Sequence, residues 1–250
     1  MTRPRALLLD AMGTLIGLRQ PVGTIYAEAA ADHGLSLDAE PLDRAFLQAY
    51  RDAPPLAFPG TAAIHLEQAE RHWWQQRIAA TFAGVGVPQL PMGLAADLFD
   101  RFAGPEPWGV YPEVPDALAR WRDRGLRLVV VSNFDRRLHR LLQRLGLGEA
   151  LEAVVVSSEV GAAKPDPAPL LRALDLLGLP AAAVWHIGDS DADEAAARVG
   201  APVRGEQTGE RGHEVGAAVV LHGHRQLLDL RGAGDHAEVV ADPLDQRAGH

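Results

Sequence analysis

The side chains best suited to chemistry stand at four separate places, each near the end of a short apolar run. They are Asp10, the pair Ser132 and Asn133, Lys164, and Asp189. A carboxylate can act as a nucleophile or bind a metal, whereas hydroxyl and ammonium groups can hold an anion such as a phosphate. Any one of these pieces is weak evidence alone. Their order along the chain, with each near the end of a different strand, is much more specific.

The segment around Asp189 is unusually acidic, since Asp191, Asp193 and Glu194 follow it within a few residues. Carboxylates packed this closely at a strand end repel one another unless a cation lies among them. Oxygen ligands of this kind suit Mg²⁺. Asp191 and Glu194 could instead favour the N-terminus of the following helix. The sequence therefore predicts a magnesium ligand at Asp189 and leaves open whether Asp191 or Asp193 is the second acidic residue.

Lys164 is the only lysine in a chain whose other cationic side chains, histidine aside, are arginines. Such a position can require a compact ammonium group instead of a planar guanidinium. Pro165 and Pro167 would fix the loop and hold the lysine beyond the sheet. The alternative is an ordinary solvated lysine in an arginine-rich composition.

The sequence contains several short, continuous apolar runs, which are typical of buried parallel strands. Most of these runs are followed by a helical pattern. Alternation of strand and helix predicts an α/β fold with a doubly wound, Rossmann-like parallel sheet. The predicted strands are Ala6–Leu9, Leu126–Val131, Ala153–Val156, Ala183–Ile187 and Ala217–Leu221, and the predicted helices are Arg136–Leu145, Pro167–Leu177 and Asp191–Val199.

Residues 17–108 break this alternation, because helical patterns follow one another there without an intervening strand. We expect an all-helical cap inserted after the first strand, with the proline-rich segment 104–115 as its return hinge. The core would then comprise residues 1–16 and 109–231, and residues 232–250 would form a flexible tail. The helices predicted in the cap are Val22–His33, Leu42–Arg51, Ile64–Phe82 and Leu94–Phe102.

The composition limits the class of partner. A formal charge of −9 argues against nucleic-acid binding, which needs a basic surface. The chain has no cysteine, no signal-peptide pattern, and no run approaching the roughly 18 apolar residues of a membrane span. The glycine-rich patterns that cradle nucleotide phosphates are also missing from the sequence. We expect a cytoplasmic protein that acts on a small molecule.

These residues together resemble the four motifs of the haloacid dehalogenase-like hydrolase superfamily, over roughly residues 5–232. The matching positions, in order, are Asp10 with Gly13 and Thr14, Ser132, Lys164 with Pro165, and Gly188-Asp189 followed by Asp193. The helical insertion resembles the family's cap. The segment from Leu18 to Leu35, the pair Trp73-Trp74 and Ser132–Leu138 further resemble the subgroup called haloacid dehalogenase-like hydrolase domain-containing protein 3.

The resemblance implies a role for each of these positions. Asp10 is the expected nucleophile, which takes up phosphoryl from a small phosphorylated substrate as an aspartyl-phosphate. Asp10, Asp189 and the backbone carbonyl of Met12 would bind Mg²⁺ directly, and Asp193 would act through water or as a weaker ligand. Lys164 would take part in catalysis and, with Ser132 and Asn133, hold the phosphate. Positioning and charge neutralisation of this kind are what phosphoryl transfer chiefly requires.

Met12 departs from the family pattern, because phosphatases of the family place a second, acid–base Asp at this position. A thioether cannot transfer a proton, and loss of a general acid–base commonly lowers a rate by about 10²–10⁴-fold. A sluggish phosphatase, a 2-haloacid dehalogenase, whose halide leaves without a proton, and an impaired phospho-ligand-binding protein are therefore the alternatives.

Further residues carry weaker hypotheses. We expect Trp73 and Trp74 to pack in the core or the cap, with contact to the substrate as the alternative. Arg136 and Arg137 are expected to be exposed helix-surface arginines, with recognition of an anion near Ser132 as the alternative. His222 and His224 are expected in a loop and not at a metal site.

Overall fold

The computed structural model describes residues 4–198 and 218–220. Its described strands include a parallel sheet of β1 (Ala6–Leu9), β4 (Arg127–Ser132), β5 (Ala153–Val156), β6 (Val184–Gly188) and β7 (Ala218–Val220), in the order β5-β4-β1-β6-β7. The chain moves outward from β1 to β5 and then returns to the other side of β1 at β6. The sheet is therefore doubly wound, and the predicted α/β class is confirmed.

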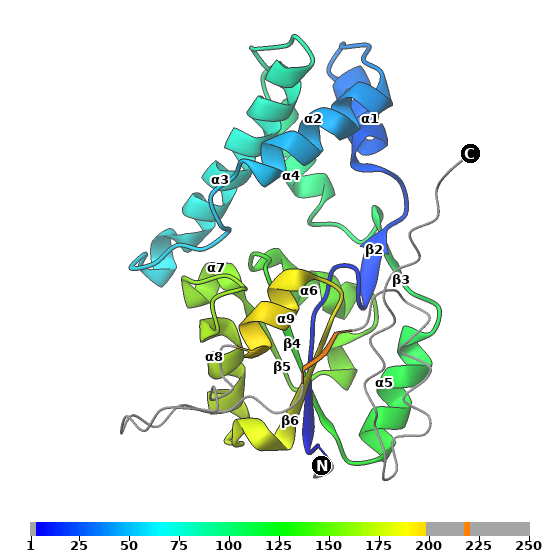
Figure 1. Cartoon of the computed structure of the whole chain (residues 1–250). Helices are drawn as coiled ribbons and strands as arrows, with labels where there is room; N and C mark the ends of the chain where they lie inside the picture. Colours follow the sequence, from blue (N-terminus) through cyan, green and yellow to red (C-terminus); the bar gives the residue numbers. More distant parts are fainter. Residues whose placement is uncertain (1–3, 199–217, 221–250) are drawn as a thin grey trace, which may run out of the picture.

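Helices cover both faces of this sheet (Figure 1). Successive side chains of a strand point to opposite faces, so each strand packs against helices on both sides. Leu7 and Leu9 of β1 pack with residues of α5 (Val114–Asp123) and α6 (Arg137–Arg144). Ala6 and Leu8 pack on the other face with residues of α8 (Ala168–Leu177) and α9 (Asp191–Arg198). The strands are apolar on both faces, which explains why they form continuous apolar runs in the sequence.

A group of helices lies beyond the carboxyl ends of the strands, clearly separate from the sheet layers (Figure 1). It contains α1 (Val22–Asp32), α2 (Ala39–Arg51), α3 (Ala63–Gly84) and α4 (Leu94–Arg101). Its own core is built around Tyr26, Phe82 and neighbouring apolar side chains. The helical pattern of residues 17–108 is thus present, while the division into core and cap at the predicted boundaries stays a prediction.

The links between the two parts include a feature that the sequence did not predict. β2 (Ile16–Leu18) and β3 (Trp108–Val110) pair as an antiparallel two-stranded ribbon. Part of segment 104–115 is therefore a strand and not a simple hinge, and α5 begins at Val114 just after it. Each strand is only 3 residues long, too short to give a pattern of its own. A short helix, α7 (Ser157–Val160), was also not predicted. His222, His224 and the tail 232–250 lie outside the described residues.

Candidate active site

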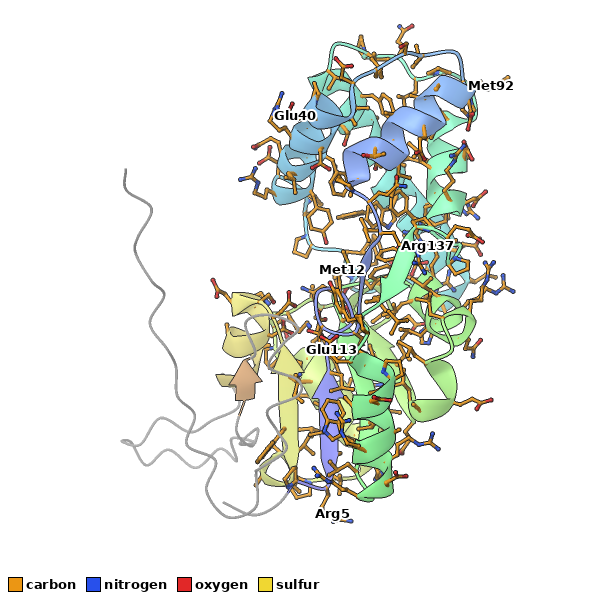
Figure 2. All side chains as sticks on the ribbon, turned by 90° about the vertical axis from the view of Figure 1, so that its right-hand side faces the viewer. Arg5, Met12, Glu40, Met92, Glu113 and Arg137 are labelled. Atoms are coloured by element: carbon orange, nitrogen blue, oxygen red, sulfur yellow. The ribbon has the colours of Figure 1, made fainter. Side chains whose placement is uncertain are left out.

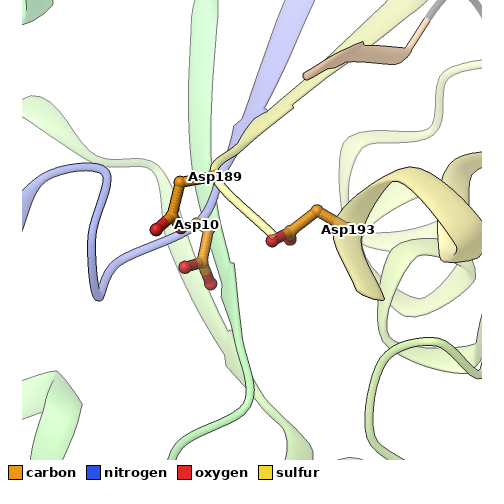
Figure 3. Close-up of side chains that lie close together, drawn as sticks. All are labelled: Asp10, Asp189 and Asp193. Carbon is orange, nitrogen blue, oxygen red and sulfur yellow. The ribbon is translucent and has the colours of Figure 1, made fainter. Parts of the chain in front are cut away.

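Asp10, Asp189 and Asp193 come together at the carboxyl end of the sheet (Figure 3). Asp10 follows β1 and Asp189 follows β6, the neighbouring strands at which the winding direction reverses. Asp193 lies in the first turn of α9. Each residue contributes one carboxylate oxygen, and these three oxygens all lie within 4.8 Å of one another. Open α/β sheets bind ligands at this point, so the two strand ends place the acids where chemistry is expected.

The charges in this cluster are only partly compensated. Burial, and then the negative charge of Asp10, raise the pKa of Asp189 above its ordinary value. Asp193 behaves in the opposite way. Its burial acts to raise its pKa, but the hydrogen bond to His186 and the charge of Lys164 outweigh this and hold the pKa of Asp193 well below its usual range. Asp191 is exposed, and the buried Asp193 is the second acid of the segment that lies in the cluster.

Lys164 is the cation of the cluster, and it is buried. Its Nζ donates to Asp10 Oδ1 at 2.7 Å and to the carbonyl oxygen of Val131 at 3.0 Å, and it also contacts Asp193 Oδ1. Burial acts to lower the pKa of Lys164, but the charges of Asp10 and Asp193 more than offset this, so its pKa is raised. An ammonium has three donors, and all of them have partners here. A substrate oxygen that binds Lys164 must therefore replace one of these partners.

Asn133 fixes the position of this lysine. Its Oδ1 accepts a hydrogen bond from the backbone N–H of Lys164, and its Nδ2 donates to the carbonyl of the same residue, both at 2.8 Å. Ser132, the last residue of β4, is buried beside it. Phosphate binding by Ser132 and Asn133 stays a prediction. The contact of the Asn133 amide with the Lys164 backbone was not indicated by the sequence.

The turn after Asp10 lets the backbone approach Asp189 closely. Gly13 has φ of 82°, and a Cβ at this position would collide with the Asp189 carboxylate. The sharp turn expected at Gly13 is present for this reason. Thr14 Oγ1 donates to Asp189 Oδ1 at 3.4 Å. Metal binding by the Met12 carbonyl stays a prediction. The Met12 side chain is 40% exposed and lies at the junction of the sheet and the helices (Figure 2).

His186 is a buried member of the site that sequence reasoning missed. Its Nε2 lies 2.9 Å from Asp193 Oδ1, and its Nδ1 lies 3.1 Å from the carbonyl oxygen of Leu8. Both ring nitrogens of His186 therefore have an oxygen atom within hydrogen-bond distance. Ser190 contacts the other oxygen of Asp193 through its hydroxyl group. A histidine inside an apolar strand next to an acidic segment was the signal available in the sequence.

Two acidic residues join the helices to the sheet part of the molecule. Asp135 accepts hydrogen bonds from the Trp74 indole at 2.6 Å and from Arg137 Nη2 at 2.7 Å. Glu70, on α3, accepts from Ser158 Oγ at 2.7 Å and pairs with Arg136 at 3.2 Å. The expectation that Arg136 and Arg137 are freely exposed is wrong, and their pairing with carboxylates also argues against the anion-binding alternative.

A cavity of about 280 Å³ lies between the helices and the sheet. Met12 and Asn133 belong to its lining, which is otherwise mostly aromatic and aliphatic. Tyr50 lines it from α2, and burial, followed by the charges of Asp10 and Asp135, raises the pKa of its phenol. The cavity is therefore next to the acid cluster. Trp74 also lines it, whereas Trp73 is buried by packing, as expected.

Comparison with known proteins assigns the family. A model of haloacid dehalogenase-like hydrolases matches residues 4–200. The chain belongs to the haloacid dehalogenase-like hydrolase family. This hydrolase is 39% identical over 188 residues to the human haloacid dehalogenase-like hydrolase domain-containing protein 3, covering 74% of each chain. It is also 44% identical over 96 residues to a plasmid-encoded phosphoglycolate phosphatase of Cupriavidus necator, covering 38% of this chain and 42% of that one. Both the superfamily and the subgroup resemblance are confirmed.

Solved structures of both a phosphatase and a dehalogenase share the fold of this hydrolase. The phosphatase of the family from Thermococcus onnurineus has a TM-score of 0.56 at 20% identity, covering 91% of this chain and 98% of that one. The L-2-haloacid dehalogenase of Xanthobacter autotrophicus has 0.60 at 17% identity, covering 92% and 100%. The fold alone therefore does not choose between the two reactions. Within the described part of the chain, no helix has the length and apolar character needed to span a membrane.

Proposed function

We propose that this protein is a Mg²⁺-dependent phosphoester hydrolase that acts on a small phosphorylated molecule through an aspartyl-phosphate on Asp10. The observation that carries this proposal is the buried grouping of Asp10, Asp189 and Asp193 around the sheet's reversal point, with the Lys164 ammonium bonded to Asp10. Nucleophile, metal ligands and a phosphate-binding cation are then within reach of one another.

The residues present fit a divalent cation. Three buried or half-buried carboxylates lie together, and the Lys164 ammonium pairs with two of them, Asp10 and Asp193. Burial, followed by the negative charge of Asp10, raises the pKa of the third, Asp189. Asp10, Asp189 and the Met12 carbonyl would hold Mg²⁺ directly. Asp193 would reach it through water, because Lys164, His186 and Ser190 already contact its oxygens. When bound, Mg²⁺ supplies positive charge that lets the anionic Asp10 approach an anionic phosphate.

Lys164 orients the nucleophile for the reaction. Its bond to Asp10 Oδ1 fixes the plane of the carboxylate, which then attacks phosphorus. A bond forms between an Asp10 oxygen and phosphorus, and the bond from phosphorus to the leaving oxygen breaks. Water then attacks the aspartyl-phosphate and releases inorganic phosphate and free Asp10. Met12 cannot donate a proton to the leaving oxygen, so water must supply it, which slows esters of weakly acidic alcohols.

Release of inorganic phosphate from a panel of phosphomonoesters, with Mg²⁺ and with EDTA, tests this function. We expect turnover that requires Mg²⁺ and is abolished by Asp10→Asn. The control is Asp191→Asn, which removes an exposed carboxylate from the same acidic segment and should retain activity. Phosphate release that survives Asp10→Asn would disprove the mechanism.

A 2-haloacid dehalogenase is a second candidate, and Met12 is the observation that favours it, since a halide leaves without a proton. The clustering of Asp189 and Asp193 with the nucleophile is the observation against it, because halide displacement has no need of a metal site. Halide release from 2-haloacids in EDTA, lost in Asp10→Asn, would establish this reaction instead.

A further inference from the structure

The cavity beside Met12 has walls suited to a flat apolar group. Aromatic rings form much of the lining, among them Tyr26, Phe46, Tyr50, Trp74, Phe99 and Phe134. Several of these rings contact one another, as with Tyr26 and Phe46 at 5.7 Å between centroids. Apolar pockets favour apolar ligands because burial removes surface of both from water.

The guanidinium, indole and amide groups of the lining already have partners. The Arg137 guanidinium is held by Asp135 and by the carbonyl of Phe99. The Trp74 indole N–H donates to Asp135, and the Asn133 amide is bound to the backbone of Lys164. These groups are therefore poorly placed to bind the hydroxyl or carboxylate groups of a sugar or an organic acid. The walls select mainly by shape and apolar contact.

The leaving-group chemistry points to the same kind of molecule. With Met12 at the acid position, an ester is cleaved readily only if its leaving oxygen needs no proton. A phenol has a pKa of about 10, against about 15.7 for water, so a phenolate departs far more readily than an ion as basic as hydroxide. Met12 both lines the apolar cavity and replaces the acid, so the two observations concern the same position.

We infer that the substrate is a phosphate monoester of an aromatic alcohol, whose ring lies in this cavity while its phosphate faces Asp10 and Lys164. This inference rests on the proposed phosphoester hydrolysis. The bond from phosphorus to the aryl oxygen breaks as the bond to Asp10 forms, and the phenolate leaves with the electron pair and takes a proton from water. An apolar cavity of about 150 Å³ accepts benzene, so about 280 Å³ holds a larger ring system.

Steady-state kinetics with phenyl phosphate and 2-naphthyl phosphate isolate the contribution of the cavity. The two leaving groups have similar acidity but differ by one fused ring. A single methylene in an apolar pocket changes kcat/KM by about 10- to 200-fold. We expect kcat/KM for the naphthyl ester, in the full chain with Mg²⁺, to exceed that for the phenyl ester by about tenfold or more.

Leu47→Glu places a carboxylate in the cavity lining at a side chain that is 51% exposed, so folding should be unaffected. We expect the preference for the naphthyl ester to fall to near unity in this variant. The matched control is Ile64→Glu on α3, which is 85% exposed and outside the lining, and which should keep the preference.

Equal kcat/KM for the two esters, or a preference that survives Leu47→Glu, would overturn the inference. Asp10-dependent release from ethyl or glycerol phosphate, with both aryl esters inert, would overturn the inference and leave the proposed function standing. If no ester releases phosphate in an Asp10-dependent way, the proposed function fails and the inference with it.

Discussion

The two sides of the cavity contrast sharply in chemistry. On the sheet side, Asp10, Asp189 and Asp193 form a largely buried charged cluster with Lys164, which comes from the loop between α7 and α8. On the helical side, α1–α4 present aromatic and aliphatic side chains. Under the proposed function, the sheet side would carry out the reaction and the helical side would select the molecule. Met12 and Asn133 lie where the two meet.

Met12→Asp gives the largest expected change in rate, because it places a group that can transfer a proton where the two sides of the cavity meet. The new carboxyl can protonate the leaving oxygen, so release of phosphate from ethyl phosphate should rise by about 10²–10⁴-fold. For aryl esters the rise should be much smaller. Parallel kcat measurements on the two ester types check this. Met92→Asp is the control, because Met92 is 96% exposed and far from the site (Figure 2). An unchanged rate for ethyl phosphate would contradict the role given to position 12.

Glu70→Gln weakens the attachment of the helical side to the sheet side. The substitution removes a buried charge that accepts from Ser158 and pairs with Arg136, and should lower the free energy of unfolding by about 2 kcal/mol. Urea unfolding measures this loss. Glu67→Gln, at an exposed position of the same helix paired with Arg71, should cost only ~0.5 kcal/mol. Equal losses in the two variants would show that the buried contact has no special importance.

Substitution of Asp97 gives the smallest expected change, which is a change in stability. Asp97 belongs to the helical side alone. The hydrogen bond from Arg101, aided by His33 and opposed by slight burial, lowers the pKa of Asp97. A lowered folded-state pKa gives stability that is present above the unfolded pKa and is lost as the pH falls through the folded value. Because Asp97 is about a third exposed, the effect should be below about 1 kcal/mol.

Thermal unfolding of the wild type and Asp97→Asn between neutral pH and pH 3 tests this small contribution. The two curves should differ at neutral pH and converge in acid. A difference that grows in acid would mean that the sign is wrong.

The sheet side was largely predictable from the sequence, because a strand ending in a polar residue carries its own local signal. Asp10 and Asp189 could be placed together since the carboxyl ends of parallel strands share one edge. His186 was missed because its contact with Asp193 depends on how α9 packs over β6, which no local pattern encodes. Asn133 was identified, but its bonds to the Lys164 backbone span 31 residues of sequence.

The helical side was predictable only as a set of helices. Helical periodicity identified α1–α4, although the ribbon of β2 and β3 went unseen. The apolar cavity arises from side chains of several helices and of the segment after β4 meeting in space. The pairs of Asp135 with Trp74 and of Glu70 with Ser158 likewise join residues 61 and 88 positions apart. Such contacts depend on the angle between packed elements, and single-sequence patterns do not specify it.

Binding of Mg²⁺ to the full chain, measured by isothermal titration calorimetry, tests the central claim most directly. We expect one Mg²⁺ site in the wild type and in Asp191→Asn, and its loss in Asp189→Asn, with circular dichroism showing that all three proteins are folded. Equal Mg²⁺ affinity in Asp189→Asn and the wild type would show that the two strand ends do not share a metal ion.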